Sequence, residues 1–215
     1  MISTGLTKLD DFLTNGLPIG CITDIFGESG TGKTQFLFQI SINCIKNGGN
    51  VIYLDTIGEF RPERIVEIAN KQNIDSDILN KLTVFRITNT SEQSKSVVKI
   101  KNSDPTLVII DNVTELFSYE YDEEELIFKK NFLFMRFMHN LSSTVIEKRI
   151  PAVVTNTIRH IDGKEIESMG ASVDLYSHVK IHLSKINSKL RCDSRYMGKK
   201  QTLEYSITAS GLVSN

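Results

Sequence analysis

The sequence predicts an α/β protein with a mostly parallel sheet, helices on both faces, and antiparallel strands at one edge. Short apolar runs alternate with longer helix-compatible segments over the first 156 residues. These runs lack a regular polar alternation, as do strands that are covered on both sides. After about residue 174 the apolar runs alternate more strongly and leave no room for helices between them. That pattern indicates antiparallel pairing at the sheet edge.

The expected elements follow one another as βαβ units. We expect strands at 21–26, 51–54, 82–87, 106–110 and 151–156, and helices at 33–46, 62–71, about 91–101 and about 124–148. Further strands are expected at 175–186, 189–194 and 201–207. Strands separated by helices of this length build a parallel sheet with both faces covered. We therefore expect a single domain over residues 1–215.

Composition excludes several classes of protein. The 215 residues are 40% apolar and 24% charged with a net charge of −1, which is unlike collagen, coiled-coil or disordered chains. No global positive field attracts nucleic acid or anionic lipid, so such binding needs a local patch. The three cysteines form no CxxC pair, which favours a reduced compartment. Without a signal-peptide pattern or a spanning apolar run, we expect a soluble cytoplasmic protein with no membrane partner.

A glycine-rich motif follows the first expected strand. Residues 27–34 read GESGTGKT and match G-x-x-x-x-G-K-[ST]. Glycines let backbone N–H groups turn inward around phosphate oxygens, and the helix N-terminus adds partial positive charge. Lys33 is expected to reach the β- and γ-phosphates of ATP. The expected nucleotide-binding residues are Gly27, Glu28, Ser29, Gly30, Thr31, Gly32, Lys33, Thr34, Gln35 and Asp111.

Asp111 ends the apolar run TLVIID, where a carboxylate can hold Mg²⁺ through water. The Thr34 hydroxyl would complete the metal pair. An aspartate at a strand end also serves as a turn or helix cap, and that alternative stays open. The cofactors expected from these residues are ATP and Mg²⁺, with Thr34 and Asp111 as the metal-binding residues.

Longer segments resemble a known family. They are STGLTKLDDFLTNGLPIGCITDIFGESGTGKTQ (3–35), VIYLDTIGEFRPERI (51–65), LVIIDNVTELF (107–117), AVVTNTIRHIDG (152–163) and KLRCDS (189–194). In this order they are similar to the RecA-type recombinases, in particular the archaeal RadA/RadB branch. The resemblance implies a RecA-like phosphate-loop NTPase core, ATP and DNA binding, and a role in homologous recombination and DNA repair. The chain begins at the ATPase core, without the family's helical N-terminal DNA-binding domain or tether strand, so it is most similar to the short RadB paralogues.

Three positions depart from the family pattern. Where the family carries a glutamate that activates water, this chain has Ile57, which cannot accept a proton. Glu59 is the candidate catalytic substitute, although it also reads as a surface glutamate before a helix. The family's γ-phosphate-sensing glutamine is Thr157 here, and Arg195 replaces a proline in the segment that covers a neighbouring subunit's nucleotide. We therefore expect ATP binding with weak or absent DNA-stimulated hydrolysis, at most a weak ATPase.

The segments that correspond to the family's DNA-binding loops are acidic. The stretch near 118–131 contains Glu120, Asp122, Glu123, Glu124 and Glu125, and 158–174 contains Arg159 and Lys164 against Asp162, Glu165, Glu167 and Asp174. Phosphate contacts by Lys and Arg supply most sequence-independent affinity, and neither stretch offers them in excess. The better candidate for single-stranded or branched DNA is 176–201, where Tyr176 and Tyr196 are interleaved with basic residues: Lys180, Lys185, Lys189, Arg191, Arg195, Lys199 and Lys200. Solubilising charge on an edge strand is the alternative.

The segment FLFMRFM (132–138) is apolar at six of seven positions. It is either buried between the sheet and another layer or presents a second apolar face to a partner. Met, Phe and Arg are enriched at interfaces, so a recombinase or another repair protein is the partner expected at 126–141. His178 and His182 have a spacing that suits a metal on a helix but not on a strand, so no metal site is expected from this pair.

Three function classes remain open. The first is an ATP-binding accessory protein of recombination of the RadB kind. The second is an active, filament-forming DNA-dependent ATPase, against which Ile57 argues. The third is a KaiC-like regulatory ATPase unrelated to DNA. The segments FRPERI (60–65) and LDDFLTNGLPIG (9–20) favour the recombinase branch over the third class.

Overall fold

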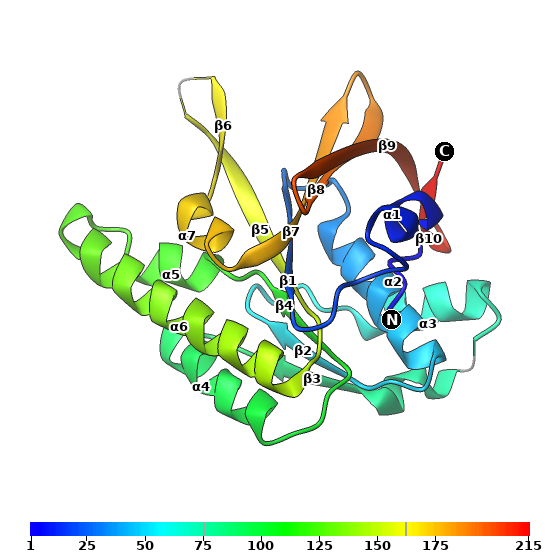
Figure 1. The fold of residues 1–215 in the computed structure, drawn as a ribbon, viewed down its shortest axis with the longest axis horizontal. Coiled ribbons are helices and arrows are strands. Elements are labelled where there is room, and N and C mark those ends of the chain that lie inside the picture. Colours follow the sequence, from blue (N-terminus) through cyan, green and yellow to red (C-terminus); the bar gives the residue numbers. More distant parts are fainter. Residues whose placement is uncertain (75, 162) are drawn as a thin grey trace.

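The computed structural model describes residues 1–74, 76–161 and 163–215 (Figure 1). One mixed sheet has the strand order β10-β9-β8-β7-β1-β5-β4-β2-β3, and β6 pairs with β5 beside this path. Strands β1, β2, β3, β4, β5 and β7 pair in parallel, and β8, β9 and β10 continue the sheet antiparallel. The fold class predicted from the sequence is therefore confirmed.

The helices and strands have the following bounds. The helices are α1 (Thr7–Phe12), α2 (Lys33–Lys46), α3 (Pro62–Lys71), α4 (Thr90–Lys101), α5 (Glu115–Glu120), α6 (Ile127–Lys148) and α7 (Gly170–Asp174), with short 3₁₀ helices η1 (Ser76–Lys81) and η2 (Glu124–Leu126). The strands are β1 (Ile22–Gly27), β2 (Val51–Asp55), β3 (Leu82–Arg86), β4 (Leu107–Asp111), β5 (Ala152–Ile161), β6 (Lys164–Glu167), β7 (Ser177–Ile186), β8 (Lys189–Tyr196), β9 (Lys199–Thr208) and β10 (Gly211–Ser214).

The helices form a layer on each face of the sheet. Strand side chains alternate between the two layers, so that on β4 Leu107 and Ile109 join one buried cluster while Val108 and Ile110 join the other. The first cluster includes side chains of α1, α2 and α3, and the second includes side chains of α4, α5, α6 and α7 (Figure 1). Every residue of β2 and β4 is buried, as the continuous apolar runs predict.

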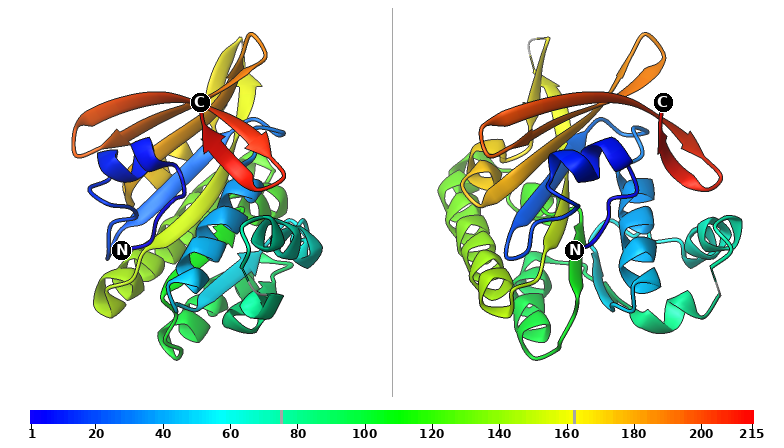
Figure 2. Two further views of the ribbon diagram at one scale, coloured as in Figure 1. Left: turned by 90° about the vertical axis from the view of Figure 1, so that its right-hand side faces the viewer. Right: turned by 45° about the vertical axis from the view of Figure 1, so that its right-hand side comes forward.

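The antiparallel strands curve over α1 and α2 (Figure 2). Gln39 of α2 fixes this arrangement from the inside, because its buried amide donates to the carbonyl of Thr4 at 3.0 Å and accepts from the N–H of Leu212 at 2.6 Å. One side chain thus joins the N-terminal segment to β10. No helix in the described part of the chain is long and apolar enough to cross a membrane.

The two stretches that correspond to the family's DNA-binding loops have regular structure. Residues 118–131 contain the end of α5, η2 and the start of α6, with Glu123, Glu124 and Glu125 exposed. Residues 158–174 form the β5–β6 hairpin and α7. The expected helix at about 124–148 is present as α6, whereas the β5–β6 hairpin was not expected. Asp162, counted in the second stretch, lies outside the described residues, as does the side chain of Lys164.

The apolar segment 132–138 is mostly buried. Phe134, Phe137 and Met138 lie in the second cluster, and Phe117 of α5 contacts both phenylalanine rings. Phe132 is 65% exposed. The second helical layer, completed by α4 and α5, therefore buries most of a surface that the sequence left open for a partner.

The predicted basic surface at 176–201 is weaker than its sequence charge suggests. Lys180 is buried and contacts Asp24 at 2.6 Å, Glu167 at 2.6 Å and Asp174 at 2.9 Å. Lys189 pairs with Glu204 and Arg191 pairs with Asp193. Tyr176 and Tyr196 are partly buried against the two core clusters rather than free to stack on bases. The charge count was misleading because the acidic partners of Lys180 and Lys189, which are Asp24, Glu167, Asp174 and Glu204, lie outside 176–201.

Removing the Lys180 ammonium should strongly destabilise the fold. Asp24 is fully buried, and burial raises its pKa well above the usual value while Lys180 opposes that shift. Lys180→Ala would leave this carboxylate without its cation, a change that typically costs about 3–5 kcal/mol of the free energy of unfolding. Urea denaturation followed by circular dichroism measures the effect. Lys189→Ala, which removes an exposed pair, is the control, and equal losses in both variants would contradict the burial argument.

Burial should also protect the cysteines. It raises the pKa of Cys44 and of Cys192 to about 11 and raises the pKa of Cys21. A thiol of pKa 11 is only about one part in a thousand thiolate at pH 8, so reaction with a thiol reagent should be slow and should accelerate with rising pH. We expect rapid labelling of all three thiols only after denaturation. Rapid native labelling of Cys44 or Cys192 would contradict this result.

Candidate functional site

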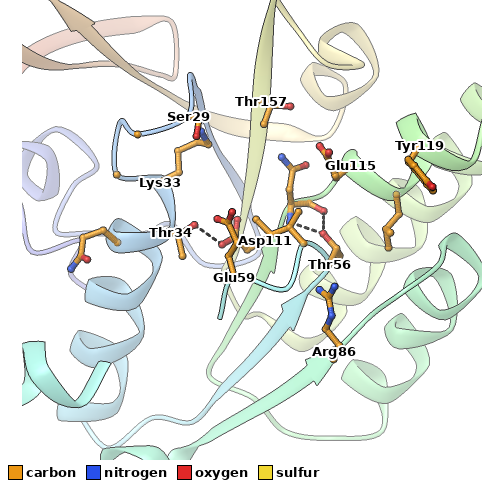
Figure 3. A pocket seen from close by; sticks show the side chains of 16 residues that line it. Ser29, Lys33, Thr34, Thr56, Glu59, Arg86, Asp111, Glu115, Tyr119 and Thr157 are labelled. Atoms are coloured by element: carbon orange, nitrogen blue, oxygen red, sulfur yellow. Dashed lines mark hydrogen bonds between the residues drawn. The ribbon is translucent and has the colours of Figure 1, made fainter. Parts of the chain in front are cut away.

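A cavity of about 820 Å³ lies at the carboxyl ends of the parallel strands (Figure 3). Of the residues predicted to bind the nucleotide or metal or to catalyse hydrolysis, those lining it are Ser29, Gly30, Gly32, Lys33, Thr34, Gln35, Glu59 and Asp111. Gly27, Glu28 and Thr31 lie in the same loop but do not line the cavity. The expected strand–loop–helix arrangement is present, since β1 ends at Gly27 and α2 begins at Lys33.

Glycines are required where the loop passes close to other backbone. Gly27 has φ +152°, and a Cβ there would lie 2.0 Å from the carbonyl oxygen of Leu183 on β7. Gly32, at the N-cap of α2, has φ +92°. A side chain at either position would force the loop away from its neighbours or strain its backbone. The glycines at these positions therefore allow the backbone conformation and the close contacts of the loop.

Polar contacts hold the loop in place. The Lys33 ammonium donates to the carbonyls of Gly27 and Glu28, both at 2.8 Å. The Tyr205 hydroxyl, from β9, donates to the carbonyl of Thr31 at 2.6 Å. Burial lowers the pKa of Lys33, while the nearby carboxylates Asp111, Glu59 and Glu28 oppose that shift. The sequence offered no signal for Tyr205, because it comes from a distant strand.

Asp111 is the centre of a buried hydrogen-bond network. The Thr34 and Tyr53 hydroxyls each donate to its Oδ2 at 2.9 Å, and the Thr155 hydroxyl donates to its Oδ1 (Figure 3 shows the Thr34 bond). Burial raises the pKa of Asp111, and these three hydrogen bonds oppose the shift. Thr34 and Asp111 come from the helix and strand that the sequence predicted to meet. Tyr53 and Thr155 were missed because their positions depend on side-chain reach and strand register.

The donor set at this end of the cavity suits a hard divalent cation. A threonine hydroxyl and a carboxylate are oxygen ligands of the kind that Mg²⁺ prefers, with remaining positions filled by water and phosphate. The backbone N–H groups of the glycine-rich loop and the first turn of α2 suit a polyphosphate. At Gly30 no heavy atom lies within 4 Å of where a Cβ would stand, so the loop is open there.

Two further carboxylates and one aliphatic side chain line the same cavity. Ile57 lies at its wall, in the position that the resemblance assigns to a glutamate. Glu59 also lines the cavity, and its charge influences Lys33. Asp55 orients this segment, because its carboxylate accepts from the N–H of Gly58 at 2.7 Å. The second of these carboxylates is Glu115, at the start of α5, which the sequence did not single out.

The positions that depart from the family pattern lie in different places. Thr157 lines the cavity. The preceding Asn156 side chain instead donates to Glu167 and to the carbonyl of Ser168, both at 2.8 Å. Arg195 lies on β8, outside the cavity lining, 3.9 Å from Asp174. Gln35 lines the cavity, and its amide oxygen accepts from Arg64 at 2.9 Å.

Comparisons with known proteins agree with this architecture. The sequence profile of the family described as Rad51 matches residues 1–199. The chain is 34% identical over 168 residues to the DNA repair and recombination protein RadA of Aeropyrum pernix, covering 73% of this chain and 53% of that protein. It is 39% identical over 132 residues to the RadA of Cenarchaeum symbiosum, covering 56% of this chain and 33% of that protein.

The chain thus spans about half of the first relative and a third of the second. The family match nevertheless covers most of this sequence, including the loop at 27–34, Asp111 and the β5–β6 hairpin. The chain therefore belongs to the Rad51 family of RecA-type recombinases.

Proposed function

We propose that this chain binds ATP with Mg²⁺ in the cavity and acts as an accessory protein of homologous recombination and DNA repair, of the RadB kind, with slow hydrolysis. The observation that carries the nucleotide assignment is the Thr34–Asp111 hydrogen bond at 2.9 Å directly beside the glycine-rich loop. It brings together the two metal-binding groups of a phosphate-loop site. Family membership supports the role in recombination.

Each site residue has a distinct task in this proposal. Loop amides and Lys33 hold the phosphates, while Thr34 and Asp111 hold the cation with water between. When bound, Mg²⁺ neutralises charge that develops on the phosphates. Tyr53 and Thr155 keep the Asp111 carboxylate oriented toward the loop. Thr157 is too short to replace a glutamine as a γ-phosphate sensor.

Slow hydrolysis follows from the side chain at position 57. Attack by water needs a carboxylate that orients or deprotonates it. Ile57 lines the cavity and supplies neither. Glu59 is the residue proposed to give whatever hydrolysis remains, because it shares the cavity and lies close enough to influence Lys33. Glu59→Gln should then remove residual turnover without removing nucleotide affinity.

DNA binding distinguishes the recombination role from a KaiC-like regulatory role. Arg195, Lys199 and Lys200 at the β8–β9 hairpin are the exposed basic residues proposed to contact phosphates. With so few contacts, affinity for single-stranded DNA should be modest and should fall with salt. Filter binding with and without ATP and Mg²⁺ tests this. Absence of binding to single-stranded and branched DNA at low salt would favour the regulatory alternative.

The exposed face of α6 is proposed as the contact with a recombinase of the same family. Phe128 is 84% exposed and Phe132 lies one turn further along the same face. Phe132→Asp should abolish co-elution with a co-expressed RadA-type recombinase in size-exclusion chromatography and leave the melting temperature nearly unchanged. Phe134→Asp, in the core, should instead unfold the protein. Unchanged co-elution of Phe132→Asp would refute this contact.

A further inference from the structure

A cluster of two glutamates and two histidines lies outside the lining of the nucleotide cavity. Glu28 comes from that loop, His160 from β5, Glu165 from β6 and His182 from β7. One ligand atom from each of Glu28, His160 and Glu165 lies within 4.8 Å of the others. The Nε2 of His182 lies 3.6 Å from Glu165 Oε2. Three metal-ligating groups therefore meet in one place, and His182 lies beside one of them.

Strand pairing brings these side chains together. In the β5–β6 hairpin His160 lies directly opposite Glu165. On the other side of β1, His182 is paired with Phe26, two residues before Glu28. The His182 ring stacks on the Phe26 ring with centroids 4.8 Å apart and planes 7° apart, which fixes the direction of its nitrogens. The cluster therefore depends on the register of three strands rather than on flexible side chains alone.

Ordinary hydrogen bonding does not account for the whole cluster. His160 Nε2 and Glu28 Oε1 are 2.5 Å apart and satisfy each other. His182 Nε2, however, is enclosed and has no hydrogen-bond partner among the described residues. A buried polar nitrogen without a partner is costly, and Glu165 Oε2, at 3.6 Å, lies beyond hydrogen-bond distance. A cation bound at Glu165 would offer this nitrogen a partner.

We propose that Glu28, His160 and Glu165 bind one divalent transition-metal ion of the zinc type, with His182 beside Glu165. Imidazole nitrogens and carboxylate oxygens are the usual ligands of Zn²⁺ and related ions. A tetrahedral ion with bonds of about 2.1 Å holds its ligand atoms about 3.4 Å apart. His160 Nε2 and Glu28 Oε1 are 2.5 Å apart, and the three ligand atoms lie within 4.8 Å of one another, a range that includes that value. The two carboxylates also balance a charge of +2, and a neutral imidazole adds no charge.

The site would connect the hairpin to the phosphate loop. Glu28 belongs to the loop, and its carbonyl accepts from Lys33. His160 and Glu165 belong to the β5–β6 hairpin, within which Asn156 donates a hydrogen bond to Glu167. A bound ion would hold the hairpin against the loop and stabilise the folded chain by mass action. His178, the other histidine of the predicted i,i+4 pair, takes no part, since its Nδ1 faces the N–H of Ile22 at 3.4 Å.

Isothermal titration of Zn²⁺ into the chelator-treated full chain tests the proposal. The protein is a Cys21→Ser background, which removes the one cysteine that is partly exposed, with excess Mg²⁺ and no nucleotide. We expect one Zn²⁺ per chain with a Kd of about 10 μM or tighter, and a higher melting temperature. Co²⁺ should give visible absorption of a four-coordinate site.

Matched variants decide where the metal binds. His160→Gln and Glu165→Gln should each weaken Zn²⁺ binding at least about tenfold, because each removes a direct ligand. His139→Gln and Glu147→Gln, on α6 outside the cluster, should not change it. A Kd near 1 mM or weaker, or equal affinity in all four variants, would overturn the proposal. Neither outcome tests ATP binding, because the Zn²⁺ titration contains excess Mg²⁺ and no nucleotide.

Discussion

Lys33→Ala should lower the affinity for ATP–Mg²⁺ by about 100-fold. The substitution removes an ammonium held at the loop by two hydrogen bonds of 2.8 Å, so its position is already set for a phosphate. Losing two charge-assisted hydrogen bonds of about 1.5 kcal/mol each gives about 3 kcal/mol, or roughly 100-fold in Kd. Calorimetric titration of both proteins with a slowly hydrolysed ATP analogue measures the change.

The control for this prediction is Lys46→Ala at the other end of α2, which removes the same charge from the same helix. It should leave the affinity unchanged. A reduction of less than about threefold in Lys33→Ala, with the fold intact by circular dichroism, would contradict the assignment of Lys33 to the phosphates.

Ile57→Glu should raise the rate of ATP hydrolysis by at least tenfold. The new carboxylate would enter the cavity wall where Ile57 now lies, beside Glu59 and Thr56. General-base catalysis contributes about 10²–10⁴-fold when the carboxylate is well placed, and imperfect placement reduces this gain. Phosphate release under saturating ATP–Mg²⁺ measures kcat, and titration of the analogue shows that binding is retained.

Ile57→Gln is the matched control, because it has a similar size and polarity without a basic carboxylate. It should not raise kcat. Equal activation by Gln and Glu would show that polarity rather than a base was missing. No activation by Glu would show that slow turnover has another cause, such as Thr157 at the position of the expected phosphate sensor.

Local sequence patterns were sufficient to predict the helices and strands that position the site residues. The bounds of α2 and α3 agree with the expected helices at 33–46 and 62–71. Thr34 and Asp111 meet because α2 begins, and the parallel strand β4 ends, at the same edge of the sheet. These features depend on motif spacing and strand polarity, which are properties of the sequence itself.

Features that depend on contacts between distant parts of the chain could not be predicted from the sequence. Lys180 was counted with a basic surface, whereas Asp24 from β1 and Glu167 from β6 bury it. Glu115 lines the cavity only because the short helix α5 begins there. The β5–β6 hairpin was missed because β5 continues beyond residue 156, where apolar residues give way to polar ones. Short elements of this kind are stabilised by tertiary packing rather than by intrinsic propensity.

The most direct test of the account is a calorimetric titration of the purified chain with ATP and Mg²⁺, paired with a hydrolysis assay on the same sample. We expect one saturable site with a Kd in about the micromolar range and turnover below about one per second, with or without single-stranded DNA. Absence of measurable affinity in the presence of Mg²⁺ would contradict the phosphate-loop assignment. Tight binding with rapid, DNA-stimulated turnover would contradict the accessory role.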